Sequence, residues 1–171
     1  MTEHTDTVPK TTRPFMPGYG LPSAAEATGL LPWSWALERL SAAHNYFLAT
    51  TRPNGAPHVM PVWGVWFNNA FFFSTGDQSR KAHNLKQNSR CVVCPERAEN
   101  AVMLEGDAEL VTDTTVLAQV EHVYDVKYHW PKITELPGGA IYRVRPRVAF
   151  GISEEEGPQT WTRWVFDREK N

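Results

Sequence analysis

Apolar residues in this chain gather in short blocks separated by turn-forming residues. Seven of the blocks are rich in Val, Ile, Phe, Tyr and Trp, which favour β-strands. Asn54-Gly55 is the strongest hairpin signal, and Asn68-Asn69 is a second tight turn, so the first three strands are expected to form an antiparallel meander. The predicted strands span residues 46–51, 58–67, 70–75, 91–94, 101–112, 140–152 and 160–167.

Three other blocks have apolar residues at helical spacing. Residues 33–45 follow Pro32, and residues 76–88 form a short helix whose buried side would hold Ala82 and Leu85. Residues 112–130 open with Thr and Asp caps and predict an amphipathic helix. Its buried side would carry Val116, Val120, Val123 and either Val126 or Lys127.

Mostly antiparallel strands with peripheral helices predict a mainly β fold. A closed or split β-barrel fits best, because closure hides the edges of a small sheet. Residues 1–32 differ from the rest: their prolines and glycines exclude a regular helix, yet their apolar residues are too many for a free linker. We therefore expect a Pro-rich N-terminal arm over 1–32, laid across the domain or a partner subunit, and one split β-barrel domain over 33–171.

Composition and charge argue against a general nucleic-acid binder and against a membrane-spanning protein. Lys and Arg total 17 against 19 for Asp and Glu, whereas a general nucleic-acid binder needs a basic surplus. No apolar run approaches the roughly 20 residues of a membrane span. The polar start, MTEHTDTVPK, does not resemble a signal peptide. We expect a cytoplasmic protein with neither a nucleic-acid partner nor a membrane span.

The two cysteines, Cys91 and Cys94, form a C-x-x-C pair that invites a metal or redox interpretation. On a strand, however, residues three apart point to opposite faces. No second Cys pair or nearby His cluster completes a zinc site. Two cysteines on a core strand, with no metal, is the favoured interpretation.

One segment combines hydroxyl groups and cations at a predicted strand-to-helix junction. The strand ends at Ser74-Thr75, and the helix starts with Ser79, Arg80 and Lys81. Unpaired N–H groups at a helix start, with cations beside them, suit an anion. The simpler alternative is a helix cap followed by two solvated charges.

This segment, S-T-x-x-x-S-R-K-x-x-N-L after an aromatic strand, resembles the phosphate-binding segment of the pyridoxamine 5′-phosphate oxidase-like, flavin-reductase-type split β-barrels. PFMPGYG, GLLPWSWALERL, ATTRPNGAPHVMPVWGVW, CVV-x-x-E and YRVRPRVAFG…TRWVF are similar to the branch that uses the deazaflavin coenzyme F420. The resemblance is collinear from residue 14 to residue 167. It implies an antiparallel, dimeric split barrel with a cofactor site.

By family position, the resemblance places the cofactor between two parts of the chain. Its phosphate would lie against Ser79, Arg80, Lys81 and Asn84, with Ser74 and Thr75 lining the same end. Its ring would lie along Met60, Pro61, Val62 and Trp63. FMN-binding members typically begin this strand with Arg and end it with Lys, whereas this chain has His58 and no Lys. That departure favours coenzyme F420 over FMN.

The resemblance thus implies a homodimeric oxidoreductase that transfers hydride from reduced coenzyme F420 to a conjugated small-molecule acceptor. Two alternatives stay open: an FMN-dependent pyridoxamine-phosphate-oxidase-like enzyme, and a non-catalytic F420-binding or carrier protein. No residue stands out as a proton donor. Tyr128, His129 and Trp130 could line a substrate pocket or simply pack a helix end.

Alternating charges occupy two of the predicted strands. Arginines stand at 143, 145 and 147, and acidic residues stand at 105, 107 and 109. Residues two apart on a strand share a face, so each row faces one side. A cross-strand ladder of ion pairs explains both rows without a ligand.

Overall fold

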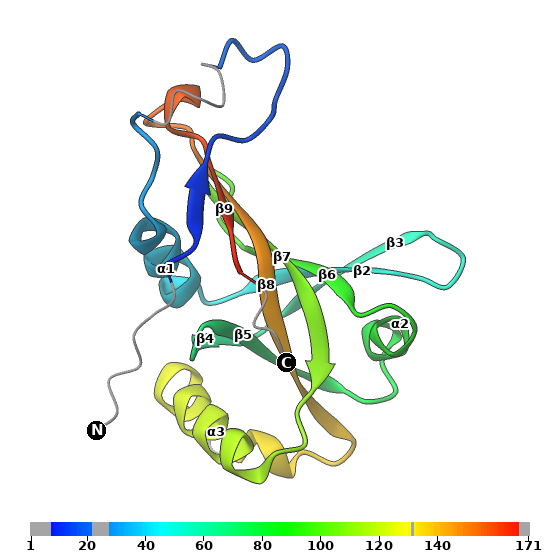
Figure 1. Cartoon of the computed structure of the whole chain (residues 1–171). Helices are drawn as coiled ribbons and strands as arrows, with labels where there is room; N and C mark the ends of the chain where they lie inside the picture. Colours follow the sequence, from blue (N-terminus) through cyan, green and yellow to red (C-terminus); the bar gives the residue numbers. More distant parts are fainter. Residues whose placement is uncertain (1–7, 22–27, 131, 168–171) are drawn as a thin grey trace.

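The computed structural model describes residues 8–21, 28–130 and 132–167, in which one antiparallel sheet is flanked by three α-helices (Figure 1). The strands are β1 Lys10–Thr12, β2 Tyr46–Thr51, β3 Pro57–Val62, β4 Gly64–Phe67, β5 Ala70–Gly76, β6 Arg90–Pro95, β7 Asn100–Leu110, β8 Gly139–Ser153 and β9 Thr162–Val165. The helices are α1 Trp33–Ala42, α2 Arg80–Gln87 and α3 Thr114–Tyr128.

The sheet curls but does not close. Its main order is β1-β9-β8-β7-β6-β2-β3, and β5 joins it by pairing with the first half of β8. Among the described strands, β4 pairs only with β5, and β3 pairs only with β2. The sequence allowed a closed or a split barrel, and the structure contains an open seam between β3 and the β4–β5 pair.

The predicted strand over 58–67 is in fact two strands. β3 runs along β2, but the chain turns at Trp63 and β4 then runs along β5. Close packing explains why Gly64 stands at this corner, since an added Cβ there would lie 2.1 Å from the Phe71 ring. The run of apolar residues hides this change of partner, because no turn-forming pair interrupts it.

Two hydrophobic cores hold the helices in place. The larger core lies inside the curled sheet and includes Leu40 of α1 and Leu85 of α2. The smaller core lies between α3 and β4–β5 and includes the buried Phe72. The buried residues of α3 are Val120, Tyr124 and Tyr128, whereas Val126 is 66% exposed. Val116 and Val123 pack against this core and Lys127 is half-buried, so the predicted buried side is confirmed with Lys127 as its last member, and the alternative, Val126, is wrong.

Two local predictions are confirmed, the bulge or bend at Gly106 and the position of both cysteines on one strand. The register of β7 against β8 shifts between Glu105 and Gly106, so Gly106 stands at a bulge. Cys91 and Cys94 both lie on β6, where burial raises the pKa of their thiols to about 12 and about 11. No group of three or more His, Cys, Asp or Glu side chains within the described residues could hold a metal ion.

The predicted arm contributes one strand, since β1 pairs antiparallel with β9. Arg13, which follows β1, is buried, and its guanidinium donates to the Gln159 carbonyl (2.8 Å). Residues 1–7 and 22–27 of the arm lie outside the described residues. None of the described helices is long and apolar enough to cross a membrane.

Candidate functional site

The two segments predicted to hold a cofactor meet at the open seam. The Tyr124 hydroxyl accepts a hydrogen bond from the Ser74 N–H (3.0 Å) and donates one to the Trp63 carbonyl (2.8 Å). This single side chain of α3 thereby joins the end of the β3 segment to the end of β5. The sequence pointed to both segments but did not identify the tyrosine that connects them.

Hydroxyl groups gather where β5 leads into α2. Ser79 is the N-cap of α2, and its Oγ accepts a hydrogen bond from the Ala82 N–H (3.2 Å). Its Oγ also lies 3.0 Å from Oγ1 of Thr75. A capped helix start presents further N–H groups, and the helix dipole places partial positive charge there. The local geometry suits an anion such as a phosphate.

The cations at the start of α2 have no carboxylate partner. Arg80 is exposed and Lys81 is half-buried, and neither forms an ion pair within the described part of the chain. Burial lowers the pKa of the Lys81 ammonium. Burial also lowers the pKa of His58, and the charges of Arg52, Lys81 and Arg80 lower it further. Arg52, Arg80 and Lys81 therefore all act on His58, and none of the three forms an ion pair within the described residues.

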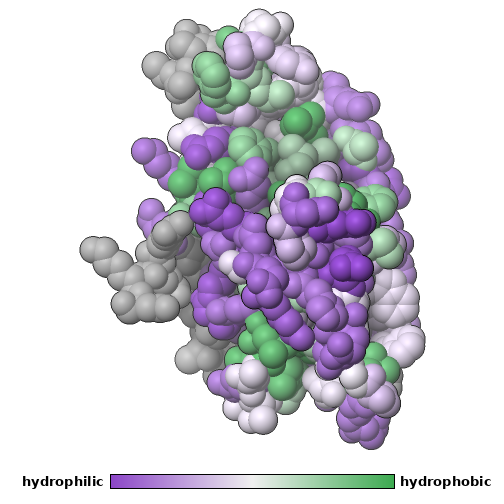
Figure 2. Space-filling model, turned by 90° about the vertical axis from the view of Figure 1, so that its right-hand side faces the viewer, coloured by the Kyte–Doolittle hydropathy of each residue, from purple (hydrophilic) through white to green (hydrophobic). Residues whose placement is uncertain are grey.

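The cation cluster belongs to a polar face. Figure 2 looks onto the side of the molecule where α2 lies and shows a broad hydrophilic area across its middle. Arg80 is exposed and Lys81 is partly exposed, so both side chains reach solvent. An anionic ligand would gain charge-assisted hydrogen bonds from these two side chains.

Asn84 occupies a different place from the rest of the motif. It is fully buried, and its Nδ2 donates to Oγ1 of Thr50 on β2 (2.9 Å). Thr50 Oγ1 in turn lies 3.4 Å from both Nδ1 and the carbonyl oxygen of His58. Asn84 therefore ties α2 to the β2–β3 hairpin, and its Oδ1 has no hydrogen-bond partner among the described residues.

The predicted ring platform is an exposed sheet edge. β3 pairs with β2 on one side, and no strand in the described residues pairs with its other side. Met60, Pro61 and Trp63 are exposed, whereas Val62 is buried. A free strand edge offers backbone donors and acceptors to a planar heterocycle. The apolar side chains beside that edge offer it a flat surface.

Aromatic rings support the far end of this platform. The Trp63 ring stacks on Tyr128 of α3, with centroids 4.8 Å apart and planes 5° apart. Trp130 meets Trp63 edge-on at 5.7 Å. The Tyr128 hydroxyl accepts from the Gly64 N–H (2.9 Å), so Tyr128 packs the helix end against the corner, as the simpler sequence interpretation expected.

Comparisons with known proteins agree with this architecture. The sequence matches the family described as pyridoxamine 5′-phosphate oxidase over residues 36–152. A sequence search among curated proteins finds no match.

Three solved structures illustrate the shared fold. The conserved hypothetical protein Rv2991 from Mycobacterium tuberculosis has a TM-score of 0.63 at 20% identity, covering 75% of this chain and 89% of its own. The heme storage protein HutZ from Vibrio cholerae has a TM-score of 0.56 at 19% identity, covering 64% and 86%. An F420 reductase has a TM-score of 0.50 at 24% identity, covering 66% and 93%. These similarities establish the fold alone.

Proposed function

Because this chain belongs to the pyridoxamine 5′-phosphate oxidase family, which includes oxidoreductases, we propose that it is an oxidoreductase that binds coenzyme F420 in the seam beside β3. The reaction would pass a hydride from the reduced coenzyme to a conjugated small-molecule acceptor. The observation that carries the proposal is the pair of unpartnered cations, Arg80 and Lys81, beside a ring platform without basic side chains. The similarity of the fold to that of an F420 reductase supports it.

The residues at the start of α2 fit a phosphate. Ser79 and Thr75 offer hydroxyl donors, and Arg80 and Lys81 offer positive charge. Each charge-assisted hydrogen bond is worth about 1.5–3 kcal/mol. Ser74 would line the same end, although Tyr124 already uses its backbone N–H. Asn84 would act through the position of α2, because its side chain is buried.

The residues along β3 fit a neutral planar ring. Met60, Pro61 and Trp63 present apolar surface, and the unpaired strand edge presents peptide groups. When bound, the reduced deazaflavin supplies a hydride from its ring carbon. The chain would orient the ring, hold the acceptor against it and exclude water from it.

We further propose a homodimer, because one outer face of the sheet is apolar and belongs to neither core. Phe47 of β2 stands opposite Pro61 on β3 and Cys94 on β6, and Ala49 stands opposite Val59 and Val92. Phe47 is 47% exposed and Val59 is 53% exposed. An apolar face of this kind is typical of a subunit interface. It adjoins the ring platform, so a second copy would wall in the cofactor.

Titration of the full-length protein with coenzyme F420 and with FMN, followed by Trp fluorescence, tests the cofactor. We expect F420 to bind at least tenfold more tightly than FMN, a difference of about 1.4 kcal/mol. Lys81→Gln should weaken F420 binding about 10- to 150-fold through the loss of one charge-assisted contact. Lys86→Gln, at the other end of α2, is the matched control and should bind like the wild type.

Turnover separates the enzyme from its alternatives. Reduced F420 mixed with the protein and a panel of quinone-like and tetrapyrrole-like acceptors should be oxidised faster than without protein. Tighter binding of FMN than of F420 would support the FMN-dependent alternative instead. F420 binding without turnover on any acceptor would support a carrier, a role compatible with the fold that the heme storage protein shares.

A further inference from the structure

Four aromatic side chains gather where β3 ends, beside the proposed ring platform. They are His44, Trp63, Tyr128 and Trp130, and together they form what we call the aromatic cluster. Tyr128 lies flat against Trp63, whereas Trp130 and His44 stand at 75° and 69° to the plane of Trp63. The cluster therefore holds its rings in two nearly perpendicular orientations.

Much of the aromatic surface in this cluster is open to solvent. Trp63 is 38% exposed and Trp130 is 39% exposed, whereas the other five tryptophans of the chain are buried or half-buried. Tyr128 covers one face of Trp63, so the exposed part of Trp63 is its other face and its edges. Two adjoining exposed indole rings form a contiguous apolar patch, and such a patch is typical of a binding surface.

The cluster is held in place by hydrogen bonds of the chain itself. The Tyr128 hydroxyl lies 2.8 Å from the carbonyl oxygens of both His44 and Gly64, and it accepts from the Gly64 N–H (2.9 Å). These contacts fix the Tyr128 ring, which in turn supports Trp63. A surface that is already fixed loses little conformational entropy when a ligand binds to it.

The polar groups of the two exposed tryptophans limit what the cluster can bind. Within the described part of the chain, the indole N–H groups of Trp63 and Trp130 make no hydrogen bond. An indole nitrogen donates and does not accept, so a ligand satisfies it with an acceptor such as a carbonyl oxygen. Flat aromatic surfaces in turn favour a flat aromatic ligand, which can stack on one ring and meet the next edge-on.

The aromatic cluster borders the proposed site of the coenzyme's ring. His58 stands near the start of β3, within range of the Arg80 and Lys81 charges, so the phosphate would lie at that end. Met60 to Trp63 extend for about 10 Å beyond it at about 3.3 Å per residue, which is roughly the length of three fused rings. A ligand on the cluster would therefore adjoin the far end of the coenzyme's ring.

We propose that Trp63 and Trp130 select the hydride acceptor, and that the acceptor is a planar aromatic carbonyl compound. Its rings would stack on the exposed face of Trp63 against Trp130, and its carbonyl oxygen would accept an indole N–H. The role as acceptor site rests on the proposed function, whereas the binding of such a compound to the cluster does not.

The reaction at this site balances with the reduced coenzyme as the reductant. A quinone, for example, would take up the hydride and its electron pair from the reduced coenzyme and a proton from water. It would leave as the hydroquinone, and the coenzyme would remain in its oxidised form. The indole N–H groups would stabilise the negative charge that develops on the carbonyl oxygen during this transfer.

Isothermal titration of the full-length protein with menadione, without any coenzyme, tests the binding step. Isophorone is the matched probe, because it is also a neutral conjugated carbonyl compound but is neither aromatic nor flat. We expect menadione to bind with a Kd of about 0.3 mM or lower and isophorone to bind at least fivefold more weakly.

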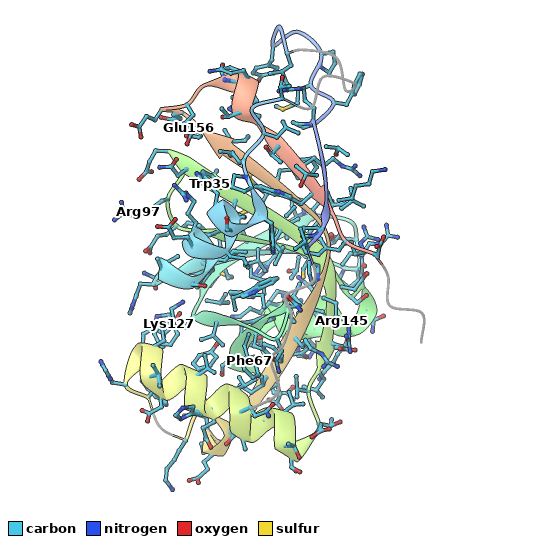
Figure 3. The ribbon with its side chains drawn as sticks, turned by 60° about the vertical axis from the view of Figure 1, so that its left-hand side comes forward. Trp35, Phe67, Arg97, Lys127, Arg145 and Glu156 are labelled. Atoms are coloured by element: carbon cyan, nitrogen blue, oxygen red, sulfur yellow. The ribbon has the colours of Figure 1, made fainter. Side chains whose placement is uncertain are left out.

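Trp130 provides the decisive variant, because it lies outside the proposed coenzyme site. Trp130→Ala should weaken menadione binding about 3- to 10-fold and leave the Kd for F420 within twofold of wild type. In turnover with reduced F420, the same variant should raise the KM for menadione by a similar factor. Tyr19→Ala is the matched control, because Tyr19 is 59% exposed and packs on Trp161, near Glu156 and far from Lys127 in Figure 3.

Three results would overturn the proposal. They are no heat of binding for menadione at 0.5 mM, equal binding of menadione and isophorone, and equal menadione binding by wild type and Trp130→Ala. If Trp130→Ala does not fold, as judged by circular dichroism, Trp130→Leu replaces it, since leucine keeps apolar volume but lacks the flat ring. Undiminished binding by a folded Trp130→Leu would also count against the site.

The two proposals can fail separately. Menadione binding that depends on Trp130, in a protein that does not bind F420, would refute the proposed function and retain a site for aromatic carbonyl compounds at the cluster. Tight F420 binding together with turnover on an acceptor, but without menadione binding, would refute this inference and retain the proposed function.

Discussion

Lys127 offers a sharp test of how α3 is attached to the strand corner. Its Nζ donates to the Tyr46 hydroxyl (2.7 Å) and to the Gly64 carbonyl (3.0 Å), and it has no carboxylate partner among the described residues. Figure 3 shows this residue at the end of α3 that faces the strands. Burial lowers the pKa of its ammonium group to about 8.

The sign of the resulting pH dependence follows from proton binding. Below pH 8 both the folded and the unfolded chain carry the Lys127 proton, so the full cost of burying the charge is present. Between pH 8 and the unfolded value of 10.5, the folded chain has released the proton and the unfolded chain still holds it. The contribution of Lys127 to the free energy of unfolding therefore rises with pH across this window.

A shift from 10.5 to about 8 corresponds to about 3 kcal/mol at 1.36 kcal/mol per pKa unit. Part of the Lys127 side chain still reaches solvent, which screens the charge and reduces the expected effect to about 1–2 kcal/mol. Burial raises the pKa of the cysteines and of Tyr124 and Tyr128, so in this range these groups lose protons in the unfolded chain before they do in the folded one. They too make stability depend on pH, so the useful quantity is the difference between wild type and Lys127→Met.

Urea unfolding at pH 7 and pH 10 measures that difference. We expect the stability of wild type relative to Lys127→Met to rise by about 1–2 kcal/mol between the two values. The exposed Lys86 provides the matched control, Lys86→Met, whose difference from wild type should not vary with pH. A flat difference for Lys127→Met would mean that the ammonium is hydrated in the folded protein, and the packing of α3 described above would be wrong.

Three further predictions concern the corner and the apolar face. Tyr124→Phe removes the hydroxyl between two strand ends and should lower the free energy of unfolding by about 1–3 kcal/mol, measured by urea titration. Gly64→Ala forces a methyl group against the Phe71 ring and should destabilise by about 1–3 kcal/mol or more, measured by thermal unfolding. Phe47→Glu should convert the proposed dimer into a folded monomer in sedimentation velocity, because Phe47 is 47% exposed in the single chain.

Much of the sheet could be predicted because strands and tight turns are local signals. The Asn54-Gly55 and Asn68-Asn69 turns both join paired strands, and Asn68 and Asn69 adopt the positive φ that such turns need. The strand β1 was missed because a three-residue strand in a Pro-rich segment has no periodicity to detect. It exists because β9 offers it an edge, which is a property of the assembled sheet.

The candidate site was predicted through a motif, which identifies residue types but not their surroundings. Ser79, Arg80 and Lys81 stand where the motif suggests, at the start of α2. Asn84 is one turn further along the same helix, and a full turn is enough to carry its side chain into the core. Burial depends on what packs against the helix, and in this case Thr50 comes from a strand 34 residues away.

The tyrosines of α3 show most clearly why the remainder of the site could not be predicted. At Trp63 and Gly64 the chain stops pairing with β2 and begins to pair with β5. Peptide groups at this corner therefore lack some of the hydrogen bonds that a neighbouring strand would provide. The hydroxyls of Tyr124 and Tyr128 take over those hydrogen bonds, from residues about 60 positions later in the chain. A buried tyrosine needs a partner for its hydroxyl, and a strand that changes partner leaves peptide groups that need one. The sequence does not show which tyrosine is buried against the corner, nor which peptide groups at the corner lack a strand partner. The tyrosine hydroxyls and the corner peptide groups could therefore be matched only in the folded structure.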